Sequence, residues 1–317
     1  MAPEIIRTHP AASIDQPRAV NNTAGMLAMM VAMIALIGSD SLVKLTSDRL
    51  PLGEILAVRS AMMVALMLPV AAWLGYLRPL KILTEKIFSI RILGELIAVS
   101  FYFTALFRMP LADVNALIQF APLATIMAAS LLFGDPVGWR RWLAAIVGLA
   151  GVILIIQPGS GNFTPYALCV FVAVAGVAMR DIATREMDRT IPSFFIAMIT
   201  GAAVGLLGLA LAPFETWVTP TQTDMLRLAG AGAFLVVAYL LMIVAVRTGE
   251  LSVVAPFRFT KVIWGVLVGY LIWGYIPNAL ALTGFALVIG AGLYAFFRER
   301  QLERRNAASP QPDGNPV

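Results

Sequence analysis

Long apolar segments alternate with short polar ones along most of the chain, from about residue 25 to about residue 297. A helix needs about 20 residues to cross a hydrocarbon core of about 30 Å. The pattern, divided at prolines, glycines and charges, predicts ten spans near 26–45, 52–74, 92–107, 113–133, 140–156, 164–181, 193–214, 226–246, 251–273 and 279–297. The predicted fold is therefore an all-α integral membrane protein with ten transmembrane helices.

The composition agrees with this pattern and leaves no room for a separate soluble domain. The chain has 317 residues, of which 60% are hydrophobic and 13% charged, and its mean hydropathy is +0.85. Such values are typical of polytopic membrane proteins. The two ends, residues 1–24 and 299–317, are polar and are predicted to be disordered tails. Residues 1–22 lack the apolar core of a cleavable signal peptide, so we expect none.

The basic residues divide unevenly between the two sets of predicted loops. With the N-terminus in the cytoplasm, sixteen Lys and Arg residues fall on the cytoplasmic side and only Arg49, Arg108 and Arg227 on the other. Loops rich in Lys and Arg stay in the cytoplasm. We therefore expect both termini to be cytoplasmic, in a cell membrane that we take to be a bacterial inner membrane.

The sequence also repeats itself at an offset of about 141 residues. DSLVKLTSDRLP at 40–51 aligns with DIATREMDRTIP at 181–192, and residues 111–134 align without gaps on 251–274. These matches predict a first five-helix repeat at 25–156, a linker at 157–165 and a second repeat at 166–298. An odd number of crossings inverts the second copy, and inverted repeats are typical of secondary transporters with a central site.

Residues 25–298 resemble the drug/metabolite transporter superfamily, and within it the EamA-type ten-helix permeases. The resemblance rests on the two five-helix halves, on Pro122 in the fourth span, on Arg59 in the second span, and on APFRFTKVIWGVLVGYLIWG in the ninth. In one departure, Tyr275 stands where an acidic residue usually follows the glycine after the ninth span. The resemblance implies transport of a small metabolite such as an amino acid, a nucleobase or a vitamin.

The ninth and fourth spans carry the strongest candidate binding residues. Arg258 and Lys261 lie three residues apart inside the ninth span, just after Pro256, which frees a backbone carbonyl. A charge at a helix centre costs about 2.5–3.5 kcal/mol on insertion scales, so it is a functional candidate by default. Asn115 and Gln119 share one face of the fourth span, which we expect to oppose the first pair across a cavity. The alternative is that both cations only hold helices together, by pairing with Glu95 or with a carbonyl.

Each of the other polar residues of the spans has two possible roles. Tyr102, Tyr239 and Trp264 either stack on a planar substrate or serve as packing and interface anchors. Glu95, near the start of the third span, either carries a coupling proton or neutralises Arg258. Arg59 is predicted to pair with Glu54 as a structural contact, with a gating role as the alternative.

Asp40 and Lys44 lie four residues apart in the first span, so they are predicted to form a pair within the helix. Lys44 is near the helix end and is expected to extend toward the membrane surface. Asp40 lies deeper, and either lines the cavity or holds helices together. We therefore keep it, with Glu95 and Arg59, as a candidate for coupling or gating.

The residues needed for most other membrane functions are absent from the sequence. The only histidine, His9, lies in the N-terminal tail, and no phosphate-binding loop for ATP is present. We therefore expect no catalytic residues, metal or cofactor, and no nucleic-acid partner. The favoured function is alternating-access transport of an anionic, zwitterionic or flat heteroaromatic solute, such as an amino acid or a riboflavin-like or nucleoside-like compound. A membrane-embedded or lipid-modifying enzyme is the alternative, and a coupling proton, a counter-solute and a homodimer are left open.

Overall fold

The computed structural model describes residues 21–133, 138–159, 164–188 and 190–308. Within these ranges all regular elements are helices. The first half contains α1 (Asn22–Thr46), α2 (Leu52–Trp73), the 3-10 helix η1 (Leu80–Thr84), α3 (Lys86–Arg108), α4 (Leu111–Ile118), α5 (Ala121–Phe133) and α6 (Trp139–Ile156). The second half contains α7 (Ala167–Glu186), α8 (Ser193–Leu211), η2 (Ala212–Phe214), α9 (Gln222–Thr248), α10 (Leu251–Val254), η3 (Ala255–Phe259), α11 (Thr260–Trp273) and α12 (Ala279–Ala308).

The prediction of ten membrane-spanning helices is confirmed. In the described part of the chain, ten helices are long and apolar enough to cross a membrane, with α4 and α5 together forming the fourth span and η3 and α11 the ninth. The largest differences from the predicted boundaries are that α3 begins at Lys86, α7 continues to Glu186, and α12 continues to Ala308. Residues 22–24 and 299–308 are therefore helical rather than disordered, whereas residues 1–20 and 309–317 lie outside the described residues.

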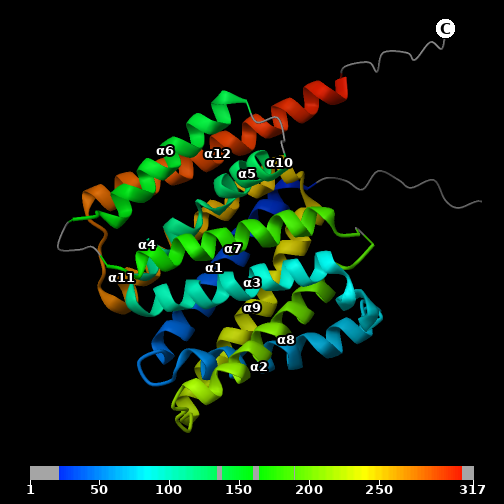
Figure 1. Cartoon of the computed structure of the whole chain (residues 1–317), viewed down its shortest axis with the longest axis vertical. Helices are drawn as coiled ribbons and strands as arrows, with labels where there is room; N and C mark the ends of the chain where they lie inside the picture. The colour runs from blue at the N-terminus through cyan, green and yellow to red at the C-terminus, as the bar shows by residue number, and fades with distance from the viewer. Residues whose placement is uncertain (1–20, 134–137, 160–163, 189, 309–317) are drawn as a thin grey trace, which may run out of the picture.

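Each long helix of one half packs along a long helix of the other half. The pairs are α1 with α9, α3 with α7, α2 with α8 and α6 with α12, and α4 also packs against α11. This set of pairs is unchanged when every helix is replaced by its counterpart in the other half, as a two-fold relationship between the repeats predicts. In Figure 1, α6 and α12 form one edge of the bundle, and α2 and α8 form the opposite edge.

Two prolines that match in the repeat occupy the same structural position. Pro51 is the N-cap of α2 and Pro192 is the N-cap of α8. Proline suits this position because the first backbone N–H groups of a helix have no partner within it. The start of α9 is fixed differently, by a capping box in which Thr221 and Asp224 each accept a hydrogen bond from the other's backbone N–H.

The fourth and ninth spans are both interrupted along their length, at aligned positions. The fourth span breaks at Gln119 and Phe120, between α4 and α5. The ninth changes from η3 to α11 at Thr260, after a 3-10 segment that contains Pro256. The two breaks contact each other, because the Gln119 Nε2 atom donates a hydrogen bond of 3.2 Å to the carbonyl oxygen of Arg258. Discontinuous helices of this kind surround the substrate sites of many transporters.

A close glycine contact sets the distance between α3 and α7. A Cβ atom on Gly94 would lie 2.7 Å from the backbone nitrogen of Arg180, and one on Gly176 would lie 2.7 Å from the backbone nitrogen of Ala98. Real Cβ atoms do not approach backbone this closely, so only glycine fits at either position. The contact brings the backbone of Arg180 against α3, the helix that carries Glu95.

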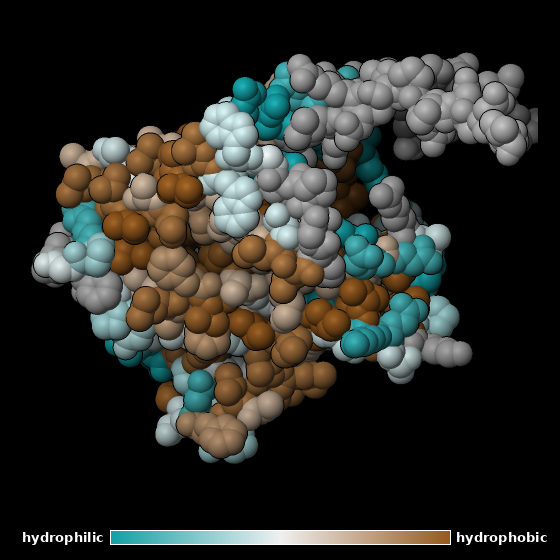
Figure 2. Space-filling model, turned by 45° about the horizontal axis from the view of Figure 1, so that its top comes forward, coloured by the Kyte–Doolittle hydropathy of each residue, from teal (hydrophilic) through white to brown (hydrophobic). Residues whose placement is uncertain are grey.

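The outer surface of the bundle suits contact with lipid. Hydrophobic residues cover most of the face shown in Figure 2, and hydrophilic residues gather at its margins. Large apolar side chains on several helices are open to the surroundings, including Ile146 at 61% and Leu271 at 69% exposure. The polar side chains Asp40, Glu54, Glu95 and Asn115 are instead among the buried residues. The protein is thus a multi-pass membrane protein whose polar groups face inward.

Candidate functional site

Four helices bring one polar residue each to the middle of the bundle. Asp40 on α1 forms an ion pair of 3.1 Å with Lys261 on α11, and it accepts a hydrogen bond of 2.7 Å from the Tyr102 hydroxyl of α3. The same hydroxyl lies 3.1 Å from the Asn115 Oδ1 atom of α4. We call Asp40, Tyr102, Asn115 and Lys261 the Asp40 cluster.

The Asp40 and Asn115 oxygens both face the Tyr102 hydroxyl, which can donate to only one of them. The Asn115 Nδ2 atom donates to the Leu111 carbonyl oxygen at 2.9 Å, so its oxygen faces Tyr102. A tyrosine hydroxyl carries a single proton and cannot donate to both Asp40 and Asn115. When Asp40 is protonated, its carboxyl group can donate to Tyr102, which then donates to Asn115, and every contact is satisfied. The geometry thus provides one donor fewer than the acceptors of Asp40 and Asn115 need.

The Arg258 side chain differs from that of Lys261 because its charge is balanced only from a distance, by the Asp181 carboxylate on α7. Arg258 lies in η3, at the fourth residue of the segment that is apolar enough to span a membrane, and the residue is exposed. Within the described residues its guanidinium makes neither a hydrogen bond nor an ion pair. The indole nitrogen of Trp264 on α11 is buried and also lacks a hydrogen-bond partner among the described residues. Both side chains of the ninth span thus carry donors that no described residue accepts.

A second group of charges lies toward the other end of α3. Arg180 on α7 forms ion pairs of 2.9 Å with Glu95 and 2.8 Å with Asp181. Arg91 donates hydrogen bonds to Thr184 at 3.2 Å and to Thr200 at 2.6 Å. We call Arg91, Glu95, Arg180 and Asp181 the Glu95 cluster. It joins the two halves through side chains of α3, α7 and α8.

Arg59 and Tyr239 lie between these two groups. The Arg59 guanidinium carbon is 4.8 Å from the ring centroid of Phe103, and the residue is within electrostatic reach of both Asp40 and Glu95. Its Nε atom is buried without a hydrogen-bond partner. Tyr239 is partly buried and within electrostatic reach of Glu95 and Arg180. Seven of the ten candidate residues of the sequence analysis are therefore connected by contacts or by electrostatic reach: Asp40, Arg59, Glu95, Tyr102, Asn115, Tyr239 and Lys261. Gln119 instead contacts the backbone of Arg258.

Comparison with known proteins identifies the family. The sequence profile described as "EamA-like transporter family" matches residues 23–157 and again residues 164–297. The chain belongs to the EamA-like transporter family. The two matches correspond to the two five-helix halves, and they agree with the resemblance noted in the sequence. Because this is a family of transporters, the alternative of a membrane-embedded or lipid-modifying enzyme is set aside.

Similar proteins of known function are transporters of different solutes. The chain is 25% identical to a riboflavin transporter of Vibrio cholerae, over 84% of this chain and 90% of that protein. It is 26% identical to a pseudopaline exporter of Pseudomonas aeruginosa, over 84% of this chain and 94% of that protein. An S-adenosylmethionine uptake transporter of Rickettsia bellii is 25% identical over 57% of this chain and 62% of its own length. The EamA-like chain is thus a small-molecule transporter whose substrate these relatives leave open.

A solved structure supports the fold. One crystal structure superposes on this EamA-like chain with a TM-score of 0.61 and 19% identity, and it covers 89% of this chain and all of the other. At this identity the likeness concerns the fold alone.

Two contacts predicted from sequence spacing are wrong. Asp40 pairs with Lys261 rather than with Lys44, and the Lys44 Nζ atom instead donates to the carbonyl oxygens of Leu106 and Met109 on α3. Arg59 lies over Phe103 rather than beside Glu54. The Glu54 side chain accepts a hydrogen bond of 3.1 Å from the Val218 backbone nitrogen instead.

Glu95 also has a different partner from the one expected. It pairs with Arg180, not with Arg258 or Lys261. Sequence reasoning missed Arg180 because the sixth span was predicted to end at Asp181, which placed Arg180 at the membrane surface. The helix continues to Glu186, so Arg180 lies inside it. The apolar run of α7 ends well before the helix does, and only the contacts with α3 reveal that Arg180 is paired with Glu95.

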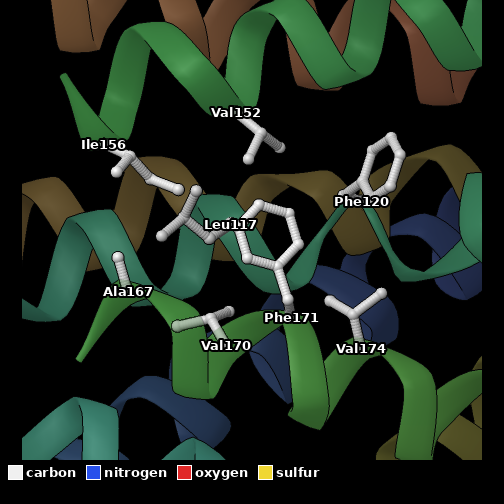
Figure 3. Close-up of a pocket in the computed structure, with 8 residues that line it drawn as sticks. All are labelled: Leu117, Phe120, Val152, Ile156, Ala167, Val170, Phe171 and Val174. Atoms are coloured by element: carbon white, nitrogen blue, oxygen red, sulfur yellow. The ribbon is translucent and has the colours of Figure 1, made fainter. Parts of the chain in front are cut away.

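One described cavity is too small and too apolar to hold a solute. It lies between α4, α6 and α7 and is lined by Leu117, Phe120, Val152, Ile156, Ala167, Val170, Phe171 and Val174. Figure 3 shows these side chains pointing toward one another with no polar group among them. Its volume of about 10 Å³ is close to that of one water molecule, and an apolar space of this size stays dry. It is a packing defect beside the fourth span, separate from the Asp40 cluster.

The end of the bundle opposite the chain termini is held by contacts between the halves. The Tyr275 hydroxyl donates a hydrogen bond of 2.7 Å to the Asp113 carboxylate, and Arg49 forms an ion pair of 3.0 Å with Asp224. Burial, followed by the nearby Asp113 carboxylate, raises the pKa of Tyr275, so its hydroxyl keeps the proton that it donates. Tyr275, which departs from the usual acidic residue at this position, thus serves as a donor to an acidic residue of the other half.

Proposed function

We propose that this EamA-like protein carries a small anionic, zwitterionic or flat heteroaromatic solute across the membrane by alternating access. The observation that supports this most is the state of Arg258, an exposed guanidinium that makes no hydrogen bond or ion pair with the described residues and lies beside the break in the ninth span. Leaving a charge unpaired in a membrane span is costly, which argues that the charge has a ligand during the transport cycle. A guanidinium binds carboxylates and phosphates through two parallel hydrogen bonds.

The surroundings of Arg258 favour a solute with both charge and a flat apolar part. Lys261 lies one turn further along and can exchange Asp40 for a substrate anion. The Trp264 indole nitrogen offers a further donor. Tyr102 lies beside Lys261, with the ammonium nitrogen 5.5 Å from its ring centroid. Amino acids, riboflavin-like compounds and nucleoside-like compounds all combine acceptor groups with a carbon skeleton that these side chains can contact.

Asp40 is the residue we assign to coupling. In the ionised state it holds Lys261, and in the protonated state it releases Lys261 and completes the hydrogen bonds through Tyr102 to Asn115. A substrate anion and a proton would then bind together, because each favours the free form of Lys261. In this scheme Arg59 and Glu95 gate rather than bind, since both are held among buried neighbours. A counter-solute that competes for Lys261 is an alternative means of coupling.

The location of the protein follows from the same reasoning. We assign it to a bacterial inner membrane with both termini in the cytoplasm, because sixteen basic residues lie on that side and three on the other. The Glu95 cluster then lies near the cytoplasmic surface, and the contact between Tyr275 and Asp113 lies near the outer one. A homodimer stays a prediction on which this scheme does not depend.

The direct test is a ligand screen on purified protein. Amino acids, riboflavin-like compounds and nucleosides are added one at a time to the wild type, to Arg258→Gln and to Arg185→Gln, and the melting temperature is measured. Arg185 is an exposed residue of α7 outside both clusters, so its variant controls for the loss of one positive charge. The best ligand is expected to stabilise the wild type and the control but not Arg258→Gln. Equal stabilisation of all three proteins would exclude Arg258 as a contact.

A further inference from the structure

A second cavity, unlike the packing defect, is large and lined by charges. A cleft of about 660 Å³ lies between the start of α6, the start of α10 and the end of α12. Its lining includes three arginines, Arg140, Arg298 and Arg300, and one carboxylate, Glu250. The arginines outnumber the carboxylate, so the cleft has a net positive charge. A net positive cleft of this volume favours a ligand that carries an anionic group.

The apolar part of the lining is exposed at the edge of the bundle. Tyr294 and Phe297 on α12 are 48% and 54% exposed and lie in the same cleft as the arginines. The helices α6 and α12 form an edge of the bundle in Figure 1. No residue of the cleft belongs to the Asp40 cluster or to the Glu95 cluster. The cleft therefore opens toward the lipid at the membrane surface rather than into the proposed transport site.

The arginines are held in a way that suits a phosphate group. The Arg298 Nη1 atom donates a hydrogen bond of 2.5 Å to the Gln301 side chain, which orients the guanidinium and leaves its other N–H groups available. The Arg140 guanidinium carbon lies 5.5 Å from the Trp139 ring centroid, and Trp139 is itself 69% exposed. Exposed aromatic rings with arginines beside them are typical of the headgroup level of a bilayer.

We propose that this cleft binds an anionic phospholipid, with the phosphate held by Arg140 and Arg298 and the acyl chains lying along Tyr294 and Phe297. Phosphate and guanidinium groups match in geometry as well as in charge. Basic pockets between transmembrane helices at a membrane surface are suited to such headgroups. A soluble anion is a poorer fit, because it would leave the exposed aromatic side chains of the same cleft without a partner.

Native mass spectrometry of the full-length protein from nanodiscs of defined lipid tests this site. The wild type is compared with the double variant Arg140→Gln/Arg298→Gln and with Arg185→Gln as the control for charge. In nanodiscs of phosphatidylglycerol, the wild type and the control are expected to retain the lipid. The double variant is expected to bind it more weakly by about fivefold for each arginine removed. In phosphatidylcholine, all three proteins are expected to retain little lipid.

Melting temperatures in phosphatidylcholine nanodiscs show whether the double variant is folded. If it is not, the single variant Arg140→Gln is used, because that side chain is exposed. Equal retention of phosphatidylglycerol by the variant and the wild type would overturn the proposal. Retention of phosphatidylcholine as strong as that of phosphatidylglycerol would also overturn it. So would displacement of the lipid by free glycerol phosphate alone, which would show that the cleft holds a soluble anion.

Discussion

The Lys261 ammonium group on α11 lies 3.1 Å from the Asp40 carboxylate on α1, so the two halves of the chain are joined by an ion pair in the interior of the bundle. Asp40 is 6% exposed, and each partner neutralises a charge that would be costly by itself at this depth. Their mutual dependence makes the pair open to a double-mutant test.

Removing one partner of the Asp40–Lys261 ion pair should lower the free energy of unfolding more than removing both partners does. Lys261→Gln leaves a buried carboxylate without a counter-charge and is expected to lower the free energy of unfolding by about 3–5 kcal/mol. The double variant Asp40→Asn/Lys261→Gln is expected to recover most of that loss. Thermal unfolding of the four proteins of the cycle in one detergent measures the coupling. Effects of the two single variants that simply add would contradict a direct pair.

The Asp40→Asn variant should change how ligand binding depends on pH. In the proposed scheme the coupling proton binds at Asp40 and frees Lys261, so binding of an anionic solute is expected to tighten as the pH falls. Asn cannot ionise, so the variant should bind at every pH about as well as the wild type does at acidic pH. Binding is followed by ligand-induced thermal shift from acidic to neutral pH. If the variant retains the pH dependence of the wild type, the proton binds at another residue.

The close approach of α3 and α7 should tolerate no side chain at its centre. In Gly176→Ala the added methyl group would lie 2.7 Å from the Ala98 backbone nitrogen, and such overpacking typically costs 1–3 kcal/mol. Gly290→Ala is the matched control, since nothing lies within 4 Å of a Cβ atom at that position. We expect the melting temperature to fall for Gly176→Ala and to change little for Gly290→Ala. Similar melting temperatures for both variants would show that the helices are not held this closely.

The contact between Tyr275 and Asp113 should contribute to stability through a single hydrogen bond. Tyr275→Phe removes the donor to the Asp113 Oδ2 atom, and the Oδ1 atom already lacks a partner. Leaving this buried carboxylate without a donor is expected to cost about 1–3 kcal/mol. Tyr270→Phe is the control, because Tyr270 is 53% exposed. The additional loss caused by Tyr275→Phe should also disappear when it is introduced into Asp113→Leu, because no carboxylate is then left without a donor. Its persistence in that background would point to another cause.

Most of the fold could be predicted from the sequence, because the length of each apolar run and the uneven distribution of Lys and Arg between loops are properties of whole segments. They do not depend on contacts between individual side chains. The repeat likewise located Pro51 and Pro192, which the structure places at equivalent helix starts. The partner of Asp40 could not be predicted. Spacing along one helix favours Lys44, but the choice between two cations depends on which helix lies opposite, and that is decided by packing between the two halves.

The cationic pair of the ninth span was found for a simple physical reason. Arg258 and Lys261 interrupt an apolar run, and the cost of a charge in a membrane makes such an interruption conspicuous. Arg180 was missed for the converse reason. Arg180 follows an apolar run at the point where a helix is expected to leave the membrane. Nothing in its local sequence indicates that it pairs with Glu95 on another helix.

Transport measured in proteoliposomes that contain only this protein tests the central claim most directly. Counterflow of labelled amino acids, riboflavin and nucleosides is compared between the wild type, Arg258→Gln and the control Arg185→Gln. Loss of one charge-assisted hydrogen bond costs about 1.5–3 kcal/mol, which corresponds to a loss of affinity of roughly 10- to 100-fold. The account predicts that a solute accumulates with the wild type and the control and fails to accumulate with Arg258→Gln at the same concentration. Equal accumulation with all three proteins would contradict a transport site at Arg258.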